Sequence, residues 1–187
     1  MPSFRRISLS FCLSLGLLAL VLFILGPAGS YARDKAEFSP SSAPVTVVIN
    51  EVAWAGTAAD VNDEWIELYN TTPVSVSLSG WRLYSSDGSP SLTLSGAIPP
   101  FGYYLLERTD DNTVSDIPAD RIYTGALSDS GEILTLTNHL GNVIDTANGD
   151  GGIWPAGSTT GRRSMERIDP AAPDTDANWA SNNGVIR

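Results

Sequence analysis

The strongest constraint on this chain is that helical periodicity is missing after residue 44. From there on, short runs of β-branched and aromatic residues alternate with Gly, Pro, Asn, Asp and Ser. No stretch of about 11 residues places apolar side chains at a 3.6-residue repeat between capping residues. The runs recur roughly every 8–12 residues, which is typical of a sandwich or barrel. The sequence therefore predicts an all-β domain.

The individual runs predict strands of different kinds. Residues 45–52 (VTVVINEV) are almost continuously apolar, as in a strand that is buried on both faces. Residues 64–70 (EWIELYN) alternate, so that odd-numbered and even-numbered side chains point to opposite faces. Residues 133–137 and 142–146 flank an Asn-His-Leu-Gly turn, which predicts a β-hairpin.

The C-terminal residues, 149–187, have weaker strand signals. They are rich in Gly, Asp, Asn, Pro and Ser, yet they contain Trp154 and Trp179. Tryptophan carries a large apolar ring that gains much from burial. We therefore expect this loop-rich tail to wrap back and pack both rings on the sandwich.

The first 32 residues predict a targeting segment rather than part of the fold. Two arginines precede an apolar stretch at residues 7–25, and Ser30-Tyr31-Ala32 offers small residues at positions −3 and −1 of a cleavage site. Without cleavage, the same stretch approaches the roughly 20 residues of a membrane anchor. In both cases the rest of the chain is expected outside the cytoplasm, either secreted or anchored.

Residues 33–44 are polar and predict a linker to a domain that spans residues 45–187. The only cysteine, Cys12, lies in the apolar leader, so the domain can form no disulfide or thiolate metal site. The formal net charge is −10, and the charged residues of the leader are both basic. An acidic domain repels phosphate backbones, which argues against nucleic-acid binding.

Four motifs follow one another in a specific order. They are an Ile-Asn-Glu strand (Asn50, Glu51), a Glu-Trp-Ile-Glu-Leu-x-Asn strand (Glu64, Trp65, Glu67, Asn70), a Leu-x-Gly-Trp-x-Leu segment (Gly80, Trp81) and a Gly-x-x-Ser-x-Glu-Arg segment (Ser164, Glu166, Arg167). Together they resemble the lamin tail domain, known from nuclear lamins and from exported bacterial proteins. The resemblance implies an immunoglobulin-like β-sandwich of antiparallel Greek-key strands, in which these residues have structural roles. It also implies an interaction or scaffold function rather than catalysis.

Catalysis has little support in the residues themselves. His139 is the one histidine, and no Gly-x-Ser-x-Gly elbow accompanies it. Glu51 and Glu67 could face each other on neighbouring strands, and a glycoside hydrolase needs only two such carboxylates. We expect them to serve packing instead, with Arg82 or Arg167 pairing with Glu67, because a buried unpaired charge is costly.

Two other groups of residues are candidates for binding. Trp54 lies in an Ala-Trp-Ala-Gly loop, where we expect it to be partly exposed near Tyr84 and to mark a ligand surface; packing is the alternative. The tryptophans of the strand motifs, Trp65 and Trp81, are expected in the core. Asp145, Asn148 and Asp150 form an oxygen-rich turn that could hold calcium, although hairpin turns also favour such residues. No other cofactor is expected.

These observations predict an exported, non-catalytic interaction or adhesion module that binds a protein or an envelope polymer outside the cytoplasm. A calcium-stabilised structural spacer and a secreted carboxylate-dependent hydrolase are the alternatives. Contact with a membrane is expected only through an uncleaved N-terminal segment.

Overall fold

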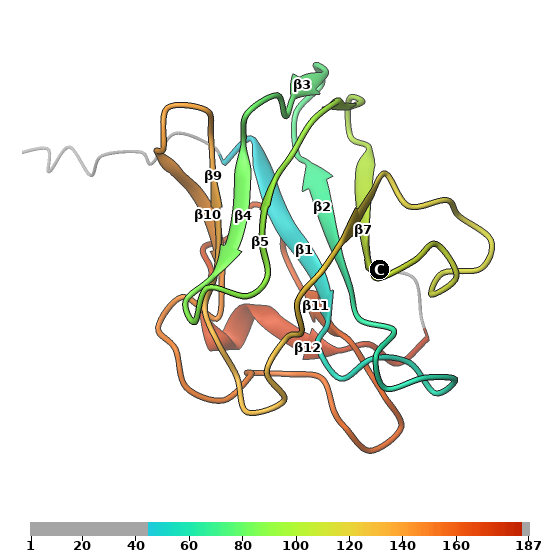
Figure 1. Ribbon diagram of the computed structural model, residues 1–187. Helices are drawn as coiled ribbons and strands as arrows, with labels where there is room; N and C mark the ends of the chain where they lie inside the picture. Colours follow the sequence, from blue (N-terminus) through green and yellow to red (C-terminus); the bar gives the residue numbers. More distant parts are fainter. Residues whose placement is uncertain (1–44, 185–187) are drawn as a thin grey trace, which may run out of the picture. The chain divides into compact units, whose positions relative to one another are not determined.

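Short strands separated by turns follow one another along residues 45–184, which are the residues that this computed structural model describes. The strands form two facing layers, visible side by side in Figure 1. The predicted leader and the whole of the predicted linker lie outside the described residues. Within the described range, no helix is long and apolar enough to cross a membrane.

Two sheets make up the layers. The larger has six strands in the order β12 (Trp179–Ser181), β11 (Met165–Arg167), β1 (Val47–Ala53), β2 (Trp65–Asn70), β7 (Tyr103–Arg108) and β8 (Arg121–Tyr123). The smaller has β10 (Val143–Ala147), β9 (Leu134–Thr137), β4 (Arg82–Ser85) and β5 (Ser91–Thr93). A short ladder pairs β3 (Val76–Ser77) with β6 (Ala97–Ile98), and the 3-10 helix η1 (Asp176–Asn178) precedes β12.

The chain alternates between the two sheets. After the β1–β2 pair it crosses to β4 and β5, returns to β7 and β8, and crosses again to β9 and β10. The strand β7 pairs with β2, and β9 pairs with β4, both antiparallel. This is an immunoglobulin-like sandwich, as the sequence predicts. One pair departs from the antiparallel pattern, because β8 runs parallel to β7.

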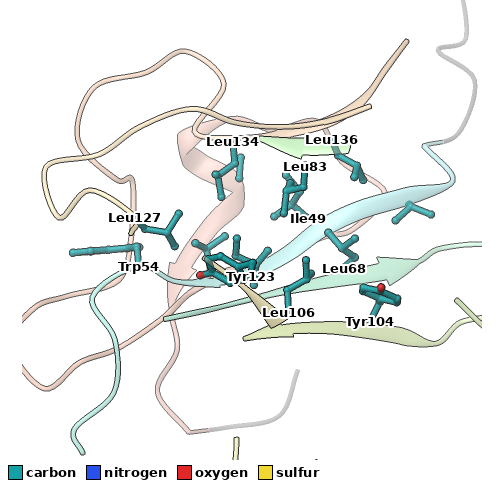
Figure 2. Close-up of a cluster of buried hydrophobic side chains, with 14 of the residues drawn as sticks. Ile49, Trp54, Leu68, Leu83, Tyr104, Leu106, Tyr123, Leu127, Leu134 and Leu136 are labelled. Atoms are coloured by element: carbon teal, nitrogen blue, oxygen red, sulfur yellow. The ribbon is translucent and has the colours of Figure 1, made fainter. Parts of the chain in front are cut away.

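The core lies between the sheets, where alternating side chains of both layers meet. Figure 2 shows fully buried Ile49, Leu68 and Leu106 of the larger sheet together with Leu83, Leu134 and Leu136 of the smaller one. Burying one such side chain contributes about 1.5–3 kcal/mol. Trp81 is 7% exposed and belongs to the same cluster, which confirms its predicted place in the core.

The C-terminal tail completes the larger sheet. The predicted burial of its tryptophans is confirmed, since Trp154 is 7% and Trp179 5% exposed. The tail also does more than pack on the sandwich, because β11 pairs with β1 and β12 pairs with β11. Strands of three residues leave no readable alternation in a sequence, which is why the tail looked like loop.

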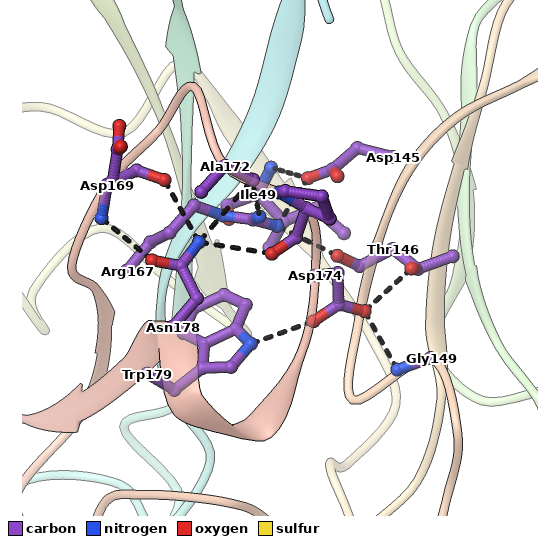
Figure 3. A network of polar contacts seen from close by, with 11 residues as sticks. Ile49, Asp145, Thr146, Gly149, Arg167, Asp169, Ala172, Asp174, Asn178 and Trp179 are labelled. Carbon is purple, nitrogen blue, oxygen red and sulfur yellow. Dashed lines mark hydrogen bonds and ion pairs between the residues drawn. The ribbon is translucent and has the colours of Figure 1, made fainter. Parts of the chain in front are cut away.

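Arg167 joins the tail to both sheets, as Figure 3 shows. Its side chain is 0% exposed, and its Nη2 lies 2.7 Å from Oδ2 of Asp145 on β10. Its Nε donates to the carbonyl of Ile49 on β1, and the Ile49 amide in turn donates to Asp145. The guanidinium also lies 4.7 Å from the ring centroid of Trp179.

Asp174 connects the C-terminal tail to β10 and to the turn that follows it. One of its oxygens accepts the indole N–H of Trp179 at 2.7 Å. The other accepts the hydroxyl of Thr146 at 2.6 Å and the amide of Gly149 at 2.8 Å (Figure 3). The tail is thus held by charge-assisted hydrogen bonds as well as by burial.

Candidate functional site: a groove on the outer face of the larger sheet

A groove lies on the outer face of the larger sheet, opposite the core. The alternation of β2 turns Trp65, Glu67 and Tyr69 outward, and their neighbours on β7 are Glu107, Leu105 and Tyr103 respectively. The groove has a volume of about 220 Å³. Its lining residues come from β2, β7 and the loop that follows β7: Trp65, Glu67, Tyr103, Leu105, Val114, Ile117 and Asp120.

A buried carboxylate and an exposed one hold this loop against the sheet. Glu107 is 0% exposed, and its two oxygens accept the amides of Thr113 and Val114, each at 3.0 Å. At the far end of the loop, Asp120 accepts the amide of Leu105 at 2.8 Å. These bonds fix Val114 and the neighbouring turn beside β7, so the wall of the groove is anchored at both ends.

Apolar and aromatic surface is exposed along the groove. Ile117 is 56% and Tyr103 55% exposed, although the core is closed without them. The ring of Tyr103 lies 4.9 Å from the ring of Tyr69, centroid to centroid, at an angle of 33°. Exposed aromatic side chains of this kind present a rigid contact surface to a partner.

A row of carboxylates borders the groove. Glu67 on β2 lies opposite Glu51 on β1, and Glu51 lies opposite Glu166 on β11. The register of β1 shifts between Ile49 and Glu51, so that Asn50 forms a bulge. From this bulge, the Asn50 amide donates to Oε1 of Glu67 at 2.9 Å, while Glu51 accepts hydrogen bonds from Ser164 and Asn182.

Burial and the neighbouring carboxylates change the pKa values of the glutamates in this row. Burial raises the pKa of Glu67 to about 7, and repulsion from Glu51 and Glu166 adds to the rise. The hydrogen bond from Asn50 acts in the opposite direction. Burial likewise raises the pKa of Glu51. Glu67 is therefore partly protonated near neutral pH, and its charge depends on what approaches the groove.

Comparison with known families identifies the chain. The Lamin Tail Domain model matches residues 40–149, which is more than half of the sequence. The chain belongs to the lamin tail domain family. This is a family of non-enzymatic immunoglobulin-like domains, which supports an interaction role in general. No curated protein matches the sequence.

The expected exposure of Trp54 in this lamin tail domain is wrong. Trp54 is 6% exposed; its ring stacks on Trp154 at 6.1 Å, and its indole N–H donates to the carbonyl of Ala156. Tyr84 belongs to the other sheet, where it lies against Arg82. Trp65, expected in the core, instead lines the outer groove. Small flanking residues do not tell whether a loop tryptophan is exposed or covered by a distant segment.

The predicted calcium turn serves another purpose in this lamin tail domain. Asp145 is bound by Arg167, and burial raises its pKa to about 6 against the lowering effect of the arginine, so it stays ionised at neutral pH. The amide of Asn148 donates to the carbonyls of Glu132 and Gly152, while Asp150 points to solvent. In the described part of the chain, no group of three or more acidic or histidine side chains could hold a metal ion.

The described residues do not show the expected pairing of Glu67 with Arg82 or Arg167. Arg167 pairs with Asp145, and Arg82 lies over Tyr84 on the smaller sheet. Within residues 45–184, the ion pairs are Arg167–Asp145 and Arg108–Glu64, the latter at 2.9 Å. The prediction that Glu51 and Glu67 face each other is confirmed by their cross-strand register.

The other residues of the sequence motifs stabilise turns and strand pairs. Asn70 is fully buried, and its amide donates to the carbonyls of Val74 at 2.7 Å and Pro99 at 2.8 Å, joining two loops. Gly80 has a φ of +75°, which a residue with a side chain rarely adopts, in the turn before Trp81. Glu64 accepts the Leu127 amide at 2.7 Å as well as binding Arg108.

Sequence reasoning missed most of the groove. Tyr103, Leu105, Val114, Ile117 and Asp120 were not candidate site residues. The signal that could have found them is Trp65 with Tyr69, because these apolar side chains share the face of β2 opposite Ile66 and Leu68. On the outward face of β2, aromatic side chains stand on both sides of a carboxylate. A strand that is apolar on one face and carries aromatic side chains on the other predicts a second buried or binding surface.

Proposed function

We propose that this lamin tail domain is an exported interaction module whose outer groove binds a protein or an envelope polymer outside the cytoplasm. One observation carries the proposal: Ile117 and Tyr103 stay more than half exposed beside a groove, while the core is already filled. Apolar and aromatic side chains that line one groove together form a contiguous exposed surface, which favours a binding partner. The apolar stretch after two arginines at the start of the sequence supports export.

The alternatives have less support. A calcium-stabilised spacer needs oxygen ligands that converge, whereas Asp145 is engaged by Arg167. A hydrolase needs two carboxylates free to act on a substrate. Glu51 and Glu67 are neighbours, but Glu51 accepts hydrogen bonds from Ser164 and Asn182, and Glu67 accepts one from Asn50.

A comparison of two matched variants tests the proposal. The tagged full chain would be incubated with fractionated envelope from the cells that produce it, and retention would be measured against concentration. We expect saturable retention that Ile117→Glu abolishes, because a carboxylate on the apolar wall would have to lose its water against the partner's apolar surface. Ile153→Glu is the control, since Ile153 is 81% exposed and does not line the groove. Equal retention of wild type and Ile117→Glu would contradict a role for the groove.

A further inference from the structure

The groove combines two chemistries that point to one kind of ligand. Leu105, Val114 and Ile117 offer an apolar wall, while Glu67 and Asp120 offer carboxylates in the same depression. Its volume of about 220 Å³ is below the roughly 300–1,000 Å³ of small-molecule pockets. The groove therefore fits one or two side chains of a larger partner.

The charge around Glu67 favours a cation over an acidic group. The acidic groups near it are Glu51 on β1, Glu166 on β11 and, across the groove, Asp120, with the hydroxyls of Tyr69 and Tyr103 alongside. Within residues 45–184, no arginine forms an ion pair with Glu67, and lysine is missing from this range of the sequence. An ammonium or guanidinium group would lower the repulsion within the row, whereas an anionic polymer would increase it.

We propose that the groove binds an extended peptide segment of a protein partner in which a lysine or arginine stands two positions from an apolar side chain. This inference rests on the proposed function and names its ligand. The apolar side chain packs against Leu105 and Ile117, and the cationic group reaches Glu67. In an extended peptide, side chains two positions apart point to the same side, so both can enter one groove.

Binding of a cation to Glu67 has a measurable consequence. The positive charge favours the ionised carboxylate, so the pKa of Glu67 falls on binding and a proton is released near neutral pH. The affinity for the cationic peptide therefore increases as the pH rises from 6 to 8. A ligand that uses only the apolar wall gives no such increase.

A peptide array tests the proposal directly. The full chain, solubilised in a non-ionic detergent, is applied to immobilised peptides that sample all pairs of residues at adjacent and alternate positions of a Gly-Ser frame. We expect the highest retention where an aliphatic or aromatic residue accompanies lysine or arginine. Acetylation of the lysine should reduce retention about threefold to tenfold, the range of a partly exposed to partly buried ion pair.

Variants separate this proposal from the broader function. Glu67→Gln keeps the shape of the side chain. It should remove the preference for cationic peptides but leave the retention of peptides with an apolar side chain. Ile117→Ser should remove the retention of both kinds of peptide. Asp150→Asn, an exposed acid outside the groove, serves as the control and should change nothing.

The possible failures are distinguishable. Retention that does not depend on the charge of the peptide, or that is unchanged in Glu67→Gln, would contradict the preference for a cationic peptide. In that case the groove is still the binding site if Ile117→Ser abolishes retention. If the wild-type chain retains no peptide above the Ile117→Ser level, the peptide is wrong, and the groove is then judged by the comparison of wild type with Ile117→Glu on envelope fractions.

Discussion

The environment of Glu67 differs from that of an ordinary surface acid. It is flanked across the sheet by another glutamate and hydrogen-bonded to an amide instead of a cation. Its pKa of about 7 means that the folded domain binds a proton that the unfolded chain releases near pH 4.5. Ionisation of Glu67 therefore costs stability, and this cost appears as the pH rises through the interval between these two values.

The first prediction concerns stability against pH. Because the folded state binds more protons than the unfolded state between about pH 4.5 and 7, the melting temperature should be higher at pH 5.5 than at pH 8. Glu67→Gln can still accept the Asn50 hydrogen bond without the charge. We expect it to raise the melting temperature at pH 8 by about 2–4 °C and to reduce the dependence on pH. Thermal unfolding followed by circular dichroism checks this, and a variant that melts below wild type at pH 8 would refute it.

At the scale of elements, the pairing of β11 with β1 depends on Arg167. Its guanidinium neutralises Asp145 and donates a hydrogen bond to the carbonyl of Ile49, the residue at which the β1 bulge begins. Both charges are withdrawn from water, with side-chain exposures of 0% and 7%. Removal of one partner from such a pair leaves the other charge buried and uncompensated, which is the costly case.

The second prediction follows from this pair. Arg167→Met retains much of the side-chain volume but leaves the buried Asp145 carboxylate without its counter-charge. It should therefore lower the free energy of unfolding by about 3–5 kcal/mol. Arg163→Met is the matched control, because Arg163 is exposed, and should change stability by less than about 0.5 kcal/mol. The double variant Arg167→Met with Asp145→Asn should recover part of the loss. Urea unfolding measures all three, and equal stabilities would show that the pair has no structural role.

The elements also show where sequence reasoning succeeds. The alternation of residues 64–70 was predictable, because burial of Ile66 and Leu68 is a property of period-two spacing. The bulge at Asn50 was not, because VTVVINEV reads as a continuous strand whether or not one residue is extra. The groove was not predictable from the sequence for a related reason. Val114 and Ile117 form its far wall and belong to a loop whose position depends on hydrogen bonds to the carboxylate of Glu107 on β7.

At the scale of the whole molecule, the family match and the folded unit have different lengths. The match ends at residue 149, yet β11 and β12 follow it and complete the larger sheet. Met165 on β11 is 0% exposed, and Trp154 and Trp179 are both buried. The later segment thus covers apolar surface of the matched part and supplies the counter-charge for Asp145.

The third prediction is that the matched part cannot fold without the later segment. A chain that stops at residue 149 leaves β1 without its β11 neighbour, Trp54 without the stacked ring of Trp154, and Asp145 without Arg167. Together these losses are comparable to the roughly 5–15 kcal/mol by which a domain is usually stable. We expect this chain to unfold without a cooperative transition and to be digested rapidly by protease. A chain that stops at residue 184 retains every one of these contacts and should show a cooperative transition. A cooperative transition in the chain that stops at residue 149 would show that the sandwich is complete before its last two strands are added.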